Sequence, residues 1–431
     1  MNKSLIIAAV VSLLSGCSGG GGTDMFPTAP PGLSTGYACI DQVGRGQGDL
    51  LSGDTPIPLG WPRQERSPVY VWRNTGWLDD QATSDHSHVL IDRDYYVEAI
   101  KPGYVAYRYP HPLAVSAPGQ GGTINAASCE LTDVTRAVAL ASDGNTVVIP
   151  TGTCTWSATL TVTKAITLQG QGIGTTVLID GVINRSMISI DTSIETGWRV
   201  TGIEIRYDGV VRKGIQAQLD IAGASHAFRV DHNRFYGYPE QSHGIRFSGD
   251  LRGVIDHNDF DDNDHFAQAI QGKHESWRGV GNHGDNSWAM QDHFGTDQFV
   301  FIENNRFEGA GDSGRNAQAG VLDMLSGARV VFRYNTVNND YVTSHGTESS
   351  QRERSFRIIE MYNNVFTTAA ADYFTAFFMR GGTGVIYNNV YKGFGSGAGY
   401  SRGVVFANFR DGDAFAPWGK CDGTSVYDEN S

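Results

Sequence analysis

The chain has few charged residues, and those it has are mostly acidic. Only 18% of its 431 residues are Asp, Glu, Lys or Arg, and the formal net charge is −13. Because phosphate binding requires a basic surface, this balance argues against nucleic acid as a partner. An acidic sugar polymer could therefore be bound only at a local basic patch or through a bridging cation.

Long apolar runs are also missing, except at the start. After residue 15 no segment reaches the roughly 18 apolar residues that span a bilayer. Residues 1–15 contain Lys3 followed by an apolar run. The LSGC sequence that ends at Cys17 resembles a bacterial lipobox. We expect residues 1–17 to be a lipoprotein signal peptide with Cys17 lipidated, and Gly-rich residues 18–32 to be a tether. An ordinary secretory peptide is the alternative, and Ser18 favours the outer membrane by analogy with Gram-negative sorting.

One six-residue phrase recurs six times, as in VDHNRF at residues 230–235 and IYNNVY at residues 386–391. Its fourth residue is always asparagine, and successive asparagines are 25, 47, 30, 29 and 25 residues apart. A period in this range indicates a solenoid, and the widest interval predicts two coils, the first without a copy. No long helical periodicity lies between the copies, which excludes helical repeats. The asparagines are Asn233, Asn258, Asn305, Asn335, Asn364 and Asn389.

Each phrase alternates apolar and polar residues, as a half-buried strand does. Asparagine tolerates the left-handed backbone conformation and bonds locally, so it suits a corner between strands. Stacked coils would place these amides about 4.8 Å apart, each bonding the next. The sequence therefore predicts an all-β fold, a parallel β-helix of about ten coils. The side chains two residues after each asparagine would form an internal stack: Phe235, Phe260, Phe307, Val337, Phe366 and Tyr391.

Residues 128–431 resemble the bacterial right-handed parallel β-helix proteins of the pectate-lyase-like superfamily. The matching residues are SCELTDVTRAV at 128–138, IPTGTCTWSATLTVTKAITLQGQG at 149–172 and the asparagine phrases. The resemblance implies right-handed winding. It is less specific for activity, because this fold hosts lyases, hydrolases, esterases and non-catalytic adhesins.

Residues 33–127 form a non-repetitive segment and a small-residue linker. Some similar proteins run from a CDGTS-like stretch, here at 421–425, directly into a GYxCxDQxGRG-like stretch, here at 36–46. This order suggests a circular permutation, with residues 33–113 packed on the far end of the solenoid formed by residues 128–431. An independent N-terminal domain is the alternative.

The start of the solenoid carries a helix signal and two cysteines. Apolar residues at 134, 137, 138 and 140 predict a capping helix within residues 131–142, with Thr132 as a possible N-cap. With Cys17 lipidated, four cysteines remain in an export context, where disulfides persist. Four cysteines permit three pairings. We favour Cys129 with Cys154, both near the cap, and Cys39 with Cys421.

The residues two before each asparagine should point outward in one row. The acidic members could bind Ca²⁺, an oxygen-seeking cation that would acidify a uronate, and Arg333 could neutralise the enolate or take the C5 proton. The alternative is a structural ladder of ion pairs, and the expected extra coil would interrupt the row between Asp256 and Glu303. The row contains Asp231, Asp256, Glu303, Arg333, Tyr362 and Tyr387.

Two further clusters are candidates. Residues 342–360 carry several arginines, which form the best anion-binding patch in an acidic protein. His345 could act as acid or base near neutral pH, and Arg352 and Arg354 could equally be a solvated loop. The insertion at residues 261–297 offers Lys273 and Trp277 for sugar binding. The candidate catalytic residues are Arg333, His345, Arg357 and Glu360, and the candidate substrate-binding residues are Arg380, Tyr362, Tyr387, Lys273 and Trp277.

We therefore expect a monomeric, exported lipoprotein, held to the outer membrane only by its lipid, that engages an acidic polysaccharide. The first hypothesis is a lyase that cleaves a uronic-acid polymer by β-elimination, with Ca²⁺ as a possible cofactor. The second is a non-catalytic carbohydrate-binding or adhesive protein. The third is a glycoside hydrolase, which needs two carboxylates about 5 to 10 Å apart, such as Glu303 with Asp323 or Glu360.

Overall fold

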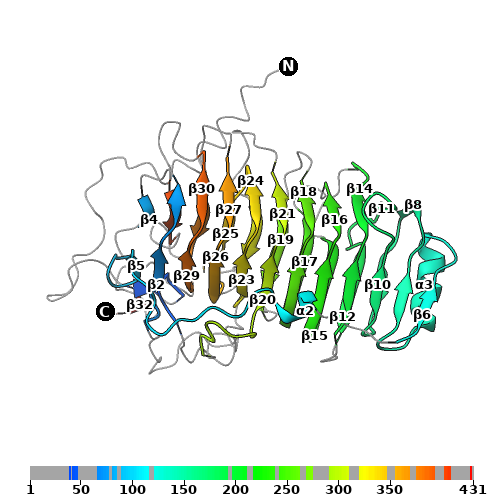
Figure 1. Cartoon of the computed structure of the whole chain (residues 1–431), viewed down its shortest axis with the longest axis horizontal. Helices are drawn as coiled ribbons and strands as arrows, with labels where there is room; N and C mark the ends of the chain where they lie inside the picture. Colours follow the sequence, from blue (N-terminus) through cyan, green and yellow to red (C-terminus); the bar gives the residue numbers. More distant parts are fainter. Residues whose placement is uncertain are drawn as a thin grey trace, which may run out of the picture.

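The computed structural model describes residues 38–39, 41–46, 66–76, 80–84, 89–115, 121–192, 197–210, 217–237, 242–262, 268–274, 291–309, 320–346, 355–368, 375–393, 402–408 and 428–429. Over these residues the strands stack into one elongated solenoid, with a helix at one end (Figure 1). Nearly all neighbouring strands pair in parallel, as β15 and β17 do. The predicted all-β parallel β-helix is confirmed.

Each coil contributes strands to three faces. A separate sheet of ten strands forms the third face, which agrees with the expected number of coils. In order along the solenoid its strands are β8 (Gly152–Trp156), β11 (Thr176–Asp180), β14 (Glu204–Tyr207), β16 (Arg234–Tyr236), β18 (Asp259–Asp261), β21 (Arg306–Glu308), β24 (Thr336–Asn338), β27 (Val365–Thr367), β30 (Val390–Lys392) and β3 (Thr75–Gly76).

The first and second faces belong to one sheet because two long strands, β15 (Ala217–Asp231) and β17 (His243–Asp256), run through both. The first face contains their first halves with β9 (Leu160–Val162), β12 (Ile188–Thr192), β19 (Gln268–Lys273), β22 (Gly320–Met324), β25 (Val342–Ser344), β28 (Phe377–Met379), β31 (Arg402–Phe406) and β4 (Asp80–Ser84). The second face contains their second halves with β6 (Thr123–Asn125), β7 (Thr146–Val148), β10 (Thr167–Gln169), β13 (Arg199–Thr201), β20 (Val300–Glu303), β23 (Arg329–Arg333), β26 (Ile358–Tyr362), β29 (Thr383–Tyr387), β2 (Val69–Trp72) and β5 (Tyr95–Val97).

The asparagine ladder is present at the corner between the second and third faces. The Nδ2 of Asn233 donates to Oδ1 of Asn258 at 3.1 Å, and each later asparagine donates to the next at 2.9 to 3.2 Å. Each side-chain oxygen also accepts the backbone N–H of the asparagine one coil earlier, as Asn258 Oδ1 does from Asn233. The predicted internal stack is confirmed too, because Phe235, Phe260 and Phe307 are buried with successive ring centroids 4.9 and 4.8 Å apart.

The corner differs from the prediction in one respect. The left-handed residue is the one before each asparagine, such as His232 (φ 54°) and Tyr334 (φ 56°), and not the asparagine itself. The chain turns at that residue. The side-chain amide of the asparagine that follows can therefore point inward and bond along the solenoid.

The interval of 47 residues holds one coil, so the prediction of two coils there was wrong. Ile255 pairs directly with Ile302, and Asp256 with Glu303. The additional residues form an insertion between β19 and β20, because a loop can lengthen without disturbing the pairing of the coils on either side.

Residues 66–98 complete the other end of the solenoid. Strands β2, β3 and β4 pair in parallel with β29, β30 and β31, so the first strands lie beside the last ones in Figure 1. Asn74 extends the ladder, since its Oδ1 accepts bonds from the backbone N–H and the Nδ2 of Asn389 at 3.0 and 2.9 Å. Its preceding residue, Arg73, is also left-handed (φ 52°). The circular permutation itself stays a prediction.

The opposite end is capped as expected. Helix α3 (Leu131–Leu140) buries Val134, Ala137 and Val138 against the first coils. The cap residue is Glu130 and not Thr132, which lies inside the helix, and it makes no side-chain capping bond. The Cys129–Cys154 disulfide is confirmed, with the Cα atoms 5.8 Å apart.

Several predictions lie outside the described residues: the lipobox with Cys17, the tether, and Cys421 of the proposed second disulfide. The backbone of Cys39 belongs to β1 (Ala38–Cys39), which pairs antiparallel with β32 (Asp428–Glu429) near the other end of the chain. Among the described helices, none has the length and apolar character to cross a membrane. The short helix α2 (Pro112–Val115) packs on β15 and β17.

The ladder predicts that Asn74→Ala destabilises the whole protein although residue 74 is remote in sequence from the repeats. Buried groups of Asn389 and the carbonyl of Ile386 would lose their partner, at a cost of about 1–3 kcal/mol for each unsatisfied group. Urea unfolding should show this loss, and Asn125→Ala, an exposed asparagine of β6, should show little. Equal effects of the two substitutions would contradict the ladder's extension.

Candidate functional site

The predicted outward row exists and is continuous on the second face. Consecutive members pair directly along the solenoid, and Trp72 follows the last of them. The expected interruption between Asp256 and Glu303 is absent, because no coil separates them. In order, the row is Asp231, Asp256, Glu303, Arg333, Tyr362, Tyr387 and Trp72.

Each carboxylate of this row binds an arginine. Asp231 accepts from Arg199 at 2.6 Å, Asp256 from Arg229 at 2.9 and 2.8 Å, and Glu303 from Arg333 at 2.7 Å. All three carboxylates are fully buried. The guanidinium groups already supply the positive charge that a cation would bring, so the row as placed does not fit Ca²⁺. The described parts of the chain contain no cluster of three or more His, Cys, Asp or Glu suited to a metal ion.

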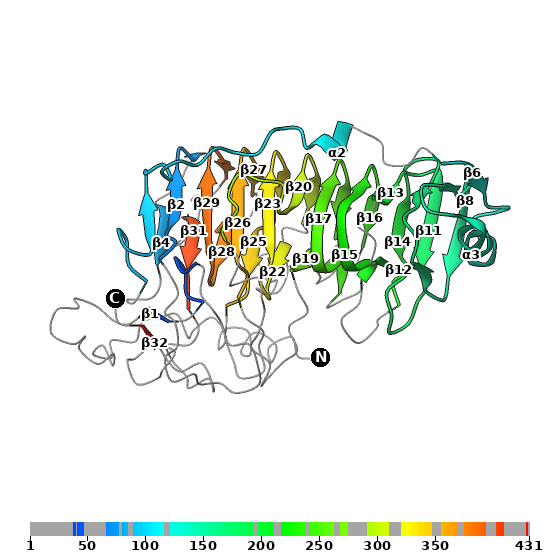
Figure 2. The same ribbon diagram turned by 90° about the horizontal axis from the view of Figure 1, so that it is seen from below.

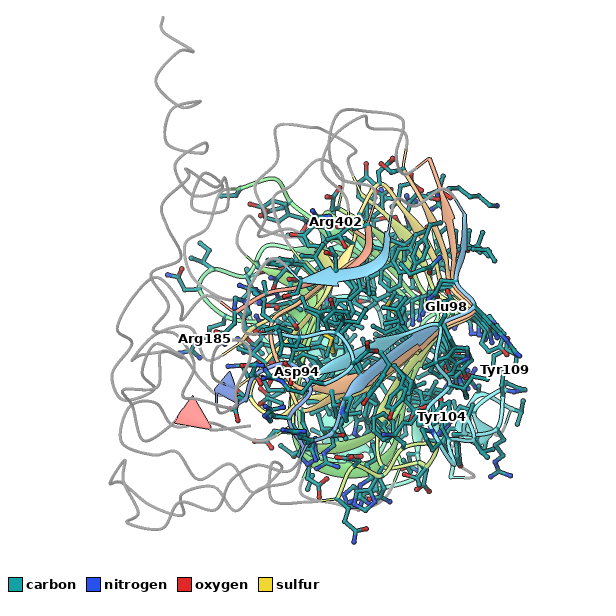
Figure 3. The ribbon with its side chains drawn as sticks, turned by 90° about the vertical axis from the view of Figure 1, so that its left-hand side faces the viewer. Asp94, Glu98, Tyr104, Tyr109, Arg185 and Arg402 are labelled. Carbon is teal, nitrogen blue, oxygen red and sulfur yellow. A yellow bond between two sulfur atoms is a disulfide. The ribbon has the colours of Figure 1, made fainter. Side chains whose placement is uncertain are left out.

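A segment from the N-terminal part of the chain covers this row. We call residues 99–111 the strap; it runs from the β5 end along the second face to α2 (Figure 2). The backbone N–H of His111 donates to Glu303 at 2.9 Å, and Arg333 donates to the carbonyls of Tyr107 and Arg108 at 2.8 and 3.0 Å. Viewed along the axis, Tyr104 and Tyr109 of the strap lie on the same side, away from Arg402 (Figure 3).

The strap therefore turns an outer face into a second apolar core. Phe301, Val331 and Ile358 point away from the solenoid interior, and Ala106 and Tyr107 pack on them. Four candidate residues lie on this face: Arg333, Glu360 and Tyr362 are buried, and Tyr387 is half-buried. Arg357 is buried beside them and pairs with Asp292. The structure thus brings these five candidates together under the strap and not in an exposed groove.

Glu360 is the most perturbed carboxyl of this buried face. Burial raises the pKa of Glu360 to about 7, although bonds from the backbone N–H of Gly295 (2.7 Å) and the hydroxyl of Tyr104 (2.6 Å) oppose the shift. The group is therefore close to half-protonated at neutral pH.

A different cluster lies on the first face, around Asp323 of β22. Its Oδ2 is 3.3 Å from Nε2 of His345 and accepts from the side-chain amides of Gln268 at 3.1 Å and Gln271 at 3.4 Å. Burial alone would raise the pKa of Asp323, but His345, Arg380 and His243 together lower it well below its usual range. Asp323 is therefore ionised and orients the imidazole of His345, whose side chain is 18% exposed.

His243 lies beside the same carboxylate. It is buried, and neither of its ring nitrogens forms a hydrogen bond within the described part of the chain. Burial, helped by the charge of Arg246, lowers the pKa of His243 to about 4, so its imidazole is neutral at pH 7. The Oδ1 of Asp323 is likewise buried without a hydrogen-bond partner among the described residues. The cluster therefore holds polar atoms that the protein itself does not satisfy.

Positive charges flank this cluster. Arg380 follows β28, where its Nε donates to the carbonyl of Ser344, the residue before His345. Arg246 lies on β17 and bonds Asp220 at 2.9 Å, and Lys273 ends β19, two strands from His345. We call Asp323, His345, His243, Gln268, Gln271, Arg380, Arg246 and Lys273 the first-face cluster.

Of the candidates named from the sequence, His345, Arg380 and Lys273 belong to the first-face cluster. Trp277, Arg352 and Arg354 lie outside the described residues. His243, Gln268 and Gln271 were missed because they belong to no repeated phrase. Their position in the coil could have indicated them, because each lies on a first-face strand, which follows the third-face strand in every turn.

No protein-family model matches the chain, and a search of curated proteins finds no match. Among solved structures, the chain is similar to an alginate lyase from Paenibacillus sp. str. FPU-7, with 16% identity over 63% of this chain and 98% of that one and a TM-score of 0.34. It is also similar to the PL6 family alginate lyase AlyGC, with 14% identity over 68% and 40% of the two chains and a TM-score of 0.35. ORF18 of Geobacillus virus E2 matches with 14% identity over 66% and 59% and a TM-score of 0.36. Such low scores carry no argument about activity.

The buried Glu360 predicts a pH dependence of stability. Between about pH 4.5 and 7 the folded protein holds a proton that the unfolded chain has released, so this group's contribution to stability falls as pH rises through that window. The Glu360→Gln variant lacks this proton, so it should gain stability relative to the wild type from pH 4.5 to 7 and gain no more above that. Urea unfolding at a series of pH values measures the difference.

Glu98→Gln, which removes one carboxylate at an exposed position, is the matched control. If the stability difference between wild type and Glu360→Gln does not change with pH, the raised pKa is disproved.

Proposed function

We propose that the protein is a polysaccharide lyase that cleaves a uronic-acid-containing polymer at the first-face cluster. The observation that carries the proposal is the His345–Asp323 pair, at 3.3 Å, placed between cationic side chains on the surface of a rigid parallel sheet. A proton-transfer group beside anion-binding groups is what β-elimination from a uronate requires.

The roles follow from the chemistry of the step. Arg380 binds the uronate carboxylate and stabilises the negative charge that develops on it. His345, oriented by Asp323, removes the proton from C5 in its neutral form. The electron pair of that C–H bond forms the C4–C5 double bond while the C4–O4 bond breaks, and the protonated His345 returns the proton to the departing O4. No water is consumed, so the product is an unsaturated sugar.

The first face also suits a polymer in shape. The outward residues Asp220, Arg246, Gln271, Asp323 and Thr343 follow one another directly from strand to strand. Asp220, Arg246 and Gln271 are half-buried, whereas Asp323 and Thr343 are buried. Since neighbouring strands are about 4.8 Å apart, a sugar chain laid along the axis over the first three would meet a new polar side chain at roughly every residue.

A hydrolase built on the residues first considered is less well supported. Glu303 and Glu360 lie on the second face under the strap, whereas Asp323 lies on the first face and its Oδ2 is engaged by His345. These carboxylates do not face one another across a cleft, as glycoside hydrolysis requires.

The proposal includes export and lipid anchoring through Cys17. The Cys129–Cys154 disulfide supports it, because disulfides persist in oxidising compartments outside the cytosol. The proposal that the lipid anchor lies in the outer membrane rests on Ser18.

The test is to incubate the protein with alginate, pectate and glycosaminoglycans and to follow the absorbance of the unsaturated product. His345→Ala should lower the rate about 10²–10⁴-fold, the usual contribution of a general base. His226→Ala is a matched control, since His226 also pairs with an aspartate (Asp250, 3.1 Å) but lies on β15, outside the first-face cluster. Arg380→Ala should raise KM and also lower kcat, because the side chain is assigned both to bind the carboxylate and to stabilise its developing charge.

The other outcomes identify the alternatives. Release of reducing ends without the absorbance would show a hydrolase. Binding of a polymer without turnover would show a carbohydrate-binding or adhesive protein. Full lyase activity in His345→Ala would remove the first-face cluster from the mechanism even if the activity itself stands.

A further inference from the structure

Two histidines form a second feature that the proposed lyase does not use. His232 and His257 occupy the left-handed corner position on consecutive coils, with φ of 54° and 53°. Their rings are stacked, with centroids 5.2 Å apart and planes within 2° of parallel. Both side chains are about half exposed, at 57% and 47%. They lie on the ridge between the second and third faces, away from the first-face cluster.

The hydrogen bonds of the pair determine which nitrogen faces outward. Nδ1 of His232 is 2.6 Å from Asp231, and Nδ1 of His257 is 2.8 Å from Asp256. An ionised carboxylate at this distance accepts a hydrogen bond, so in each neutral ring the hydrogen lies on Nδ1 and the lone pair on Nε2. Both carboxylates are buried and held in turn by Arg199 and Arg229. These bonds therefore set the tautomer of each ring and leave the Nε2 lone pair to bind a metal, while the exposed outer edge of each ring can still move.

We propose that His232 and His257 bind a divalent transition-metal ion, of the kind that prefers imidazole, such as Zn²⁺ or Ni²⁺, through their Nε2 atoms. Imidazole suits these cations, and a carboxylate bonded to the other ring nitrogen is the usual support of a metal-binding histidine. Water would complete the coordination shell, because the ridge is exposed.

The spacing of the rings sets what binding requires. Metal–nitrogen bonds of about 2.0–2.1 Å bring two Nε2 atoms closer than the 5.2 Å between the ring centroids. The rings must therefore lean toward each other about their outer edges, which their exposure permits. Within the described coils no other corner residue of this ladder is a histidine, since these positions hold Gly202, Asn304, Tyr334, Asn363, Asn388 and Arg73.

The consequence for the protein is a link between two successive coils. An ion that binds both histidines in the folded state, and not in the unfolded chain, raises the free energy of unfolding with the logarithm of one plus the ratio of its concentration to its dissociation constant. A metal ion at this pair would therefore stabilise the solenoid and would take no part in the proposed lyase reaction.

The test uses the full chain without a histidine tag and titrates Zn²⁺ or Ni²⁺ alone by calorimetry, together with thermal unfolding. The wild type should bind one ion per chain at this pair and unfold at a higher temperature with the ion present. His232→Ala and His257→Ala should each weaken that binding at least tenfold and abolish the thermal shift. His226→Ala, a paired histidine elsewhere, should retain both.

Each variant is first compared with the wild type without metal, so that a loss of folding is recognised by its unfolding temperature. Asp256→Asn, which keeps His257 but removes its charged support, should weaken binding less than His257→Ala does. No binding to the wild type, or unchanged affinity in both histidine variants, would overturn the proposal.

Discussion

The ladder of hydrogen bonds between buried asparagine side chains is the interaction on which this structure depends. The backbone N–H and the side-chain Nδ2 of one asparagine both donate to the side-chain oxygen of the asparagine one coil later, so the register of every coil is set by its neighbour. A slip of one residue would reverse which side chains face the interior. This constraint explains why the insertion between β19 and β20 leaves Asp256 and Glu303 paired. It also explains how Asn74, far away in the sequence, takes its place as the next member.

The strap is the second feature that shapes the protein, because it determines which outer face of the solenoid a substrate can reach. The second face carries charged and aromatic residues in a continuous row, which by sequence alone resembles a binding surface. Tyr104, Tyr107 and His111 cover it, and every carboxylate beneath acquires an arginine or a strap donor. Buried charges are tolerated only when they are paired and bonded in this way. The row thus belongs to the interior of the molecule.

The first face has the opposite character. There Asp323 and His243 carry buried polar atoms that the described residues do not satisfy, beside cationic side chains. Buried polar atoms without a hydrogen-bond partner among the described residues also occur elsewhere, as at Trp198 and Gln218. The first-face cluster differs in placing them beside an ionised carboxylate and cationic side chains. The paired His232 and His257 are a milder case, in which only the outward nitrogens remain open.

By itself, the sequence determined the features that depend on repeated or local patterns of residues. The periodic phrases predicted the β-helix, the asparagine ladder and the phenylalanine stack. The apolar spacing and the cysteines near the start of the solenoid predicted the capping helix and the Cys129–Cys154 bond. Only the tertiary structure decided what lies over the second face, since the strap comes from the non-repetitive part of the chain and its contact with Glu303 and Glu360 spans some two hundred residues. It likewise decided that His243 meets Asp323, because side chains that share no phrase are brought together only by the stacking of their coils.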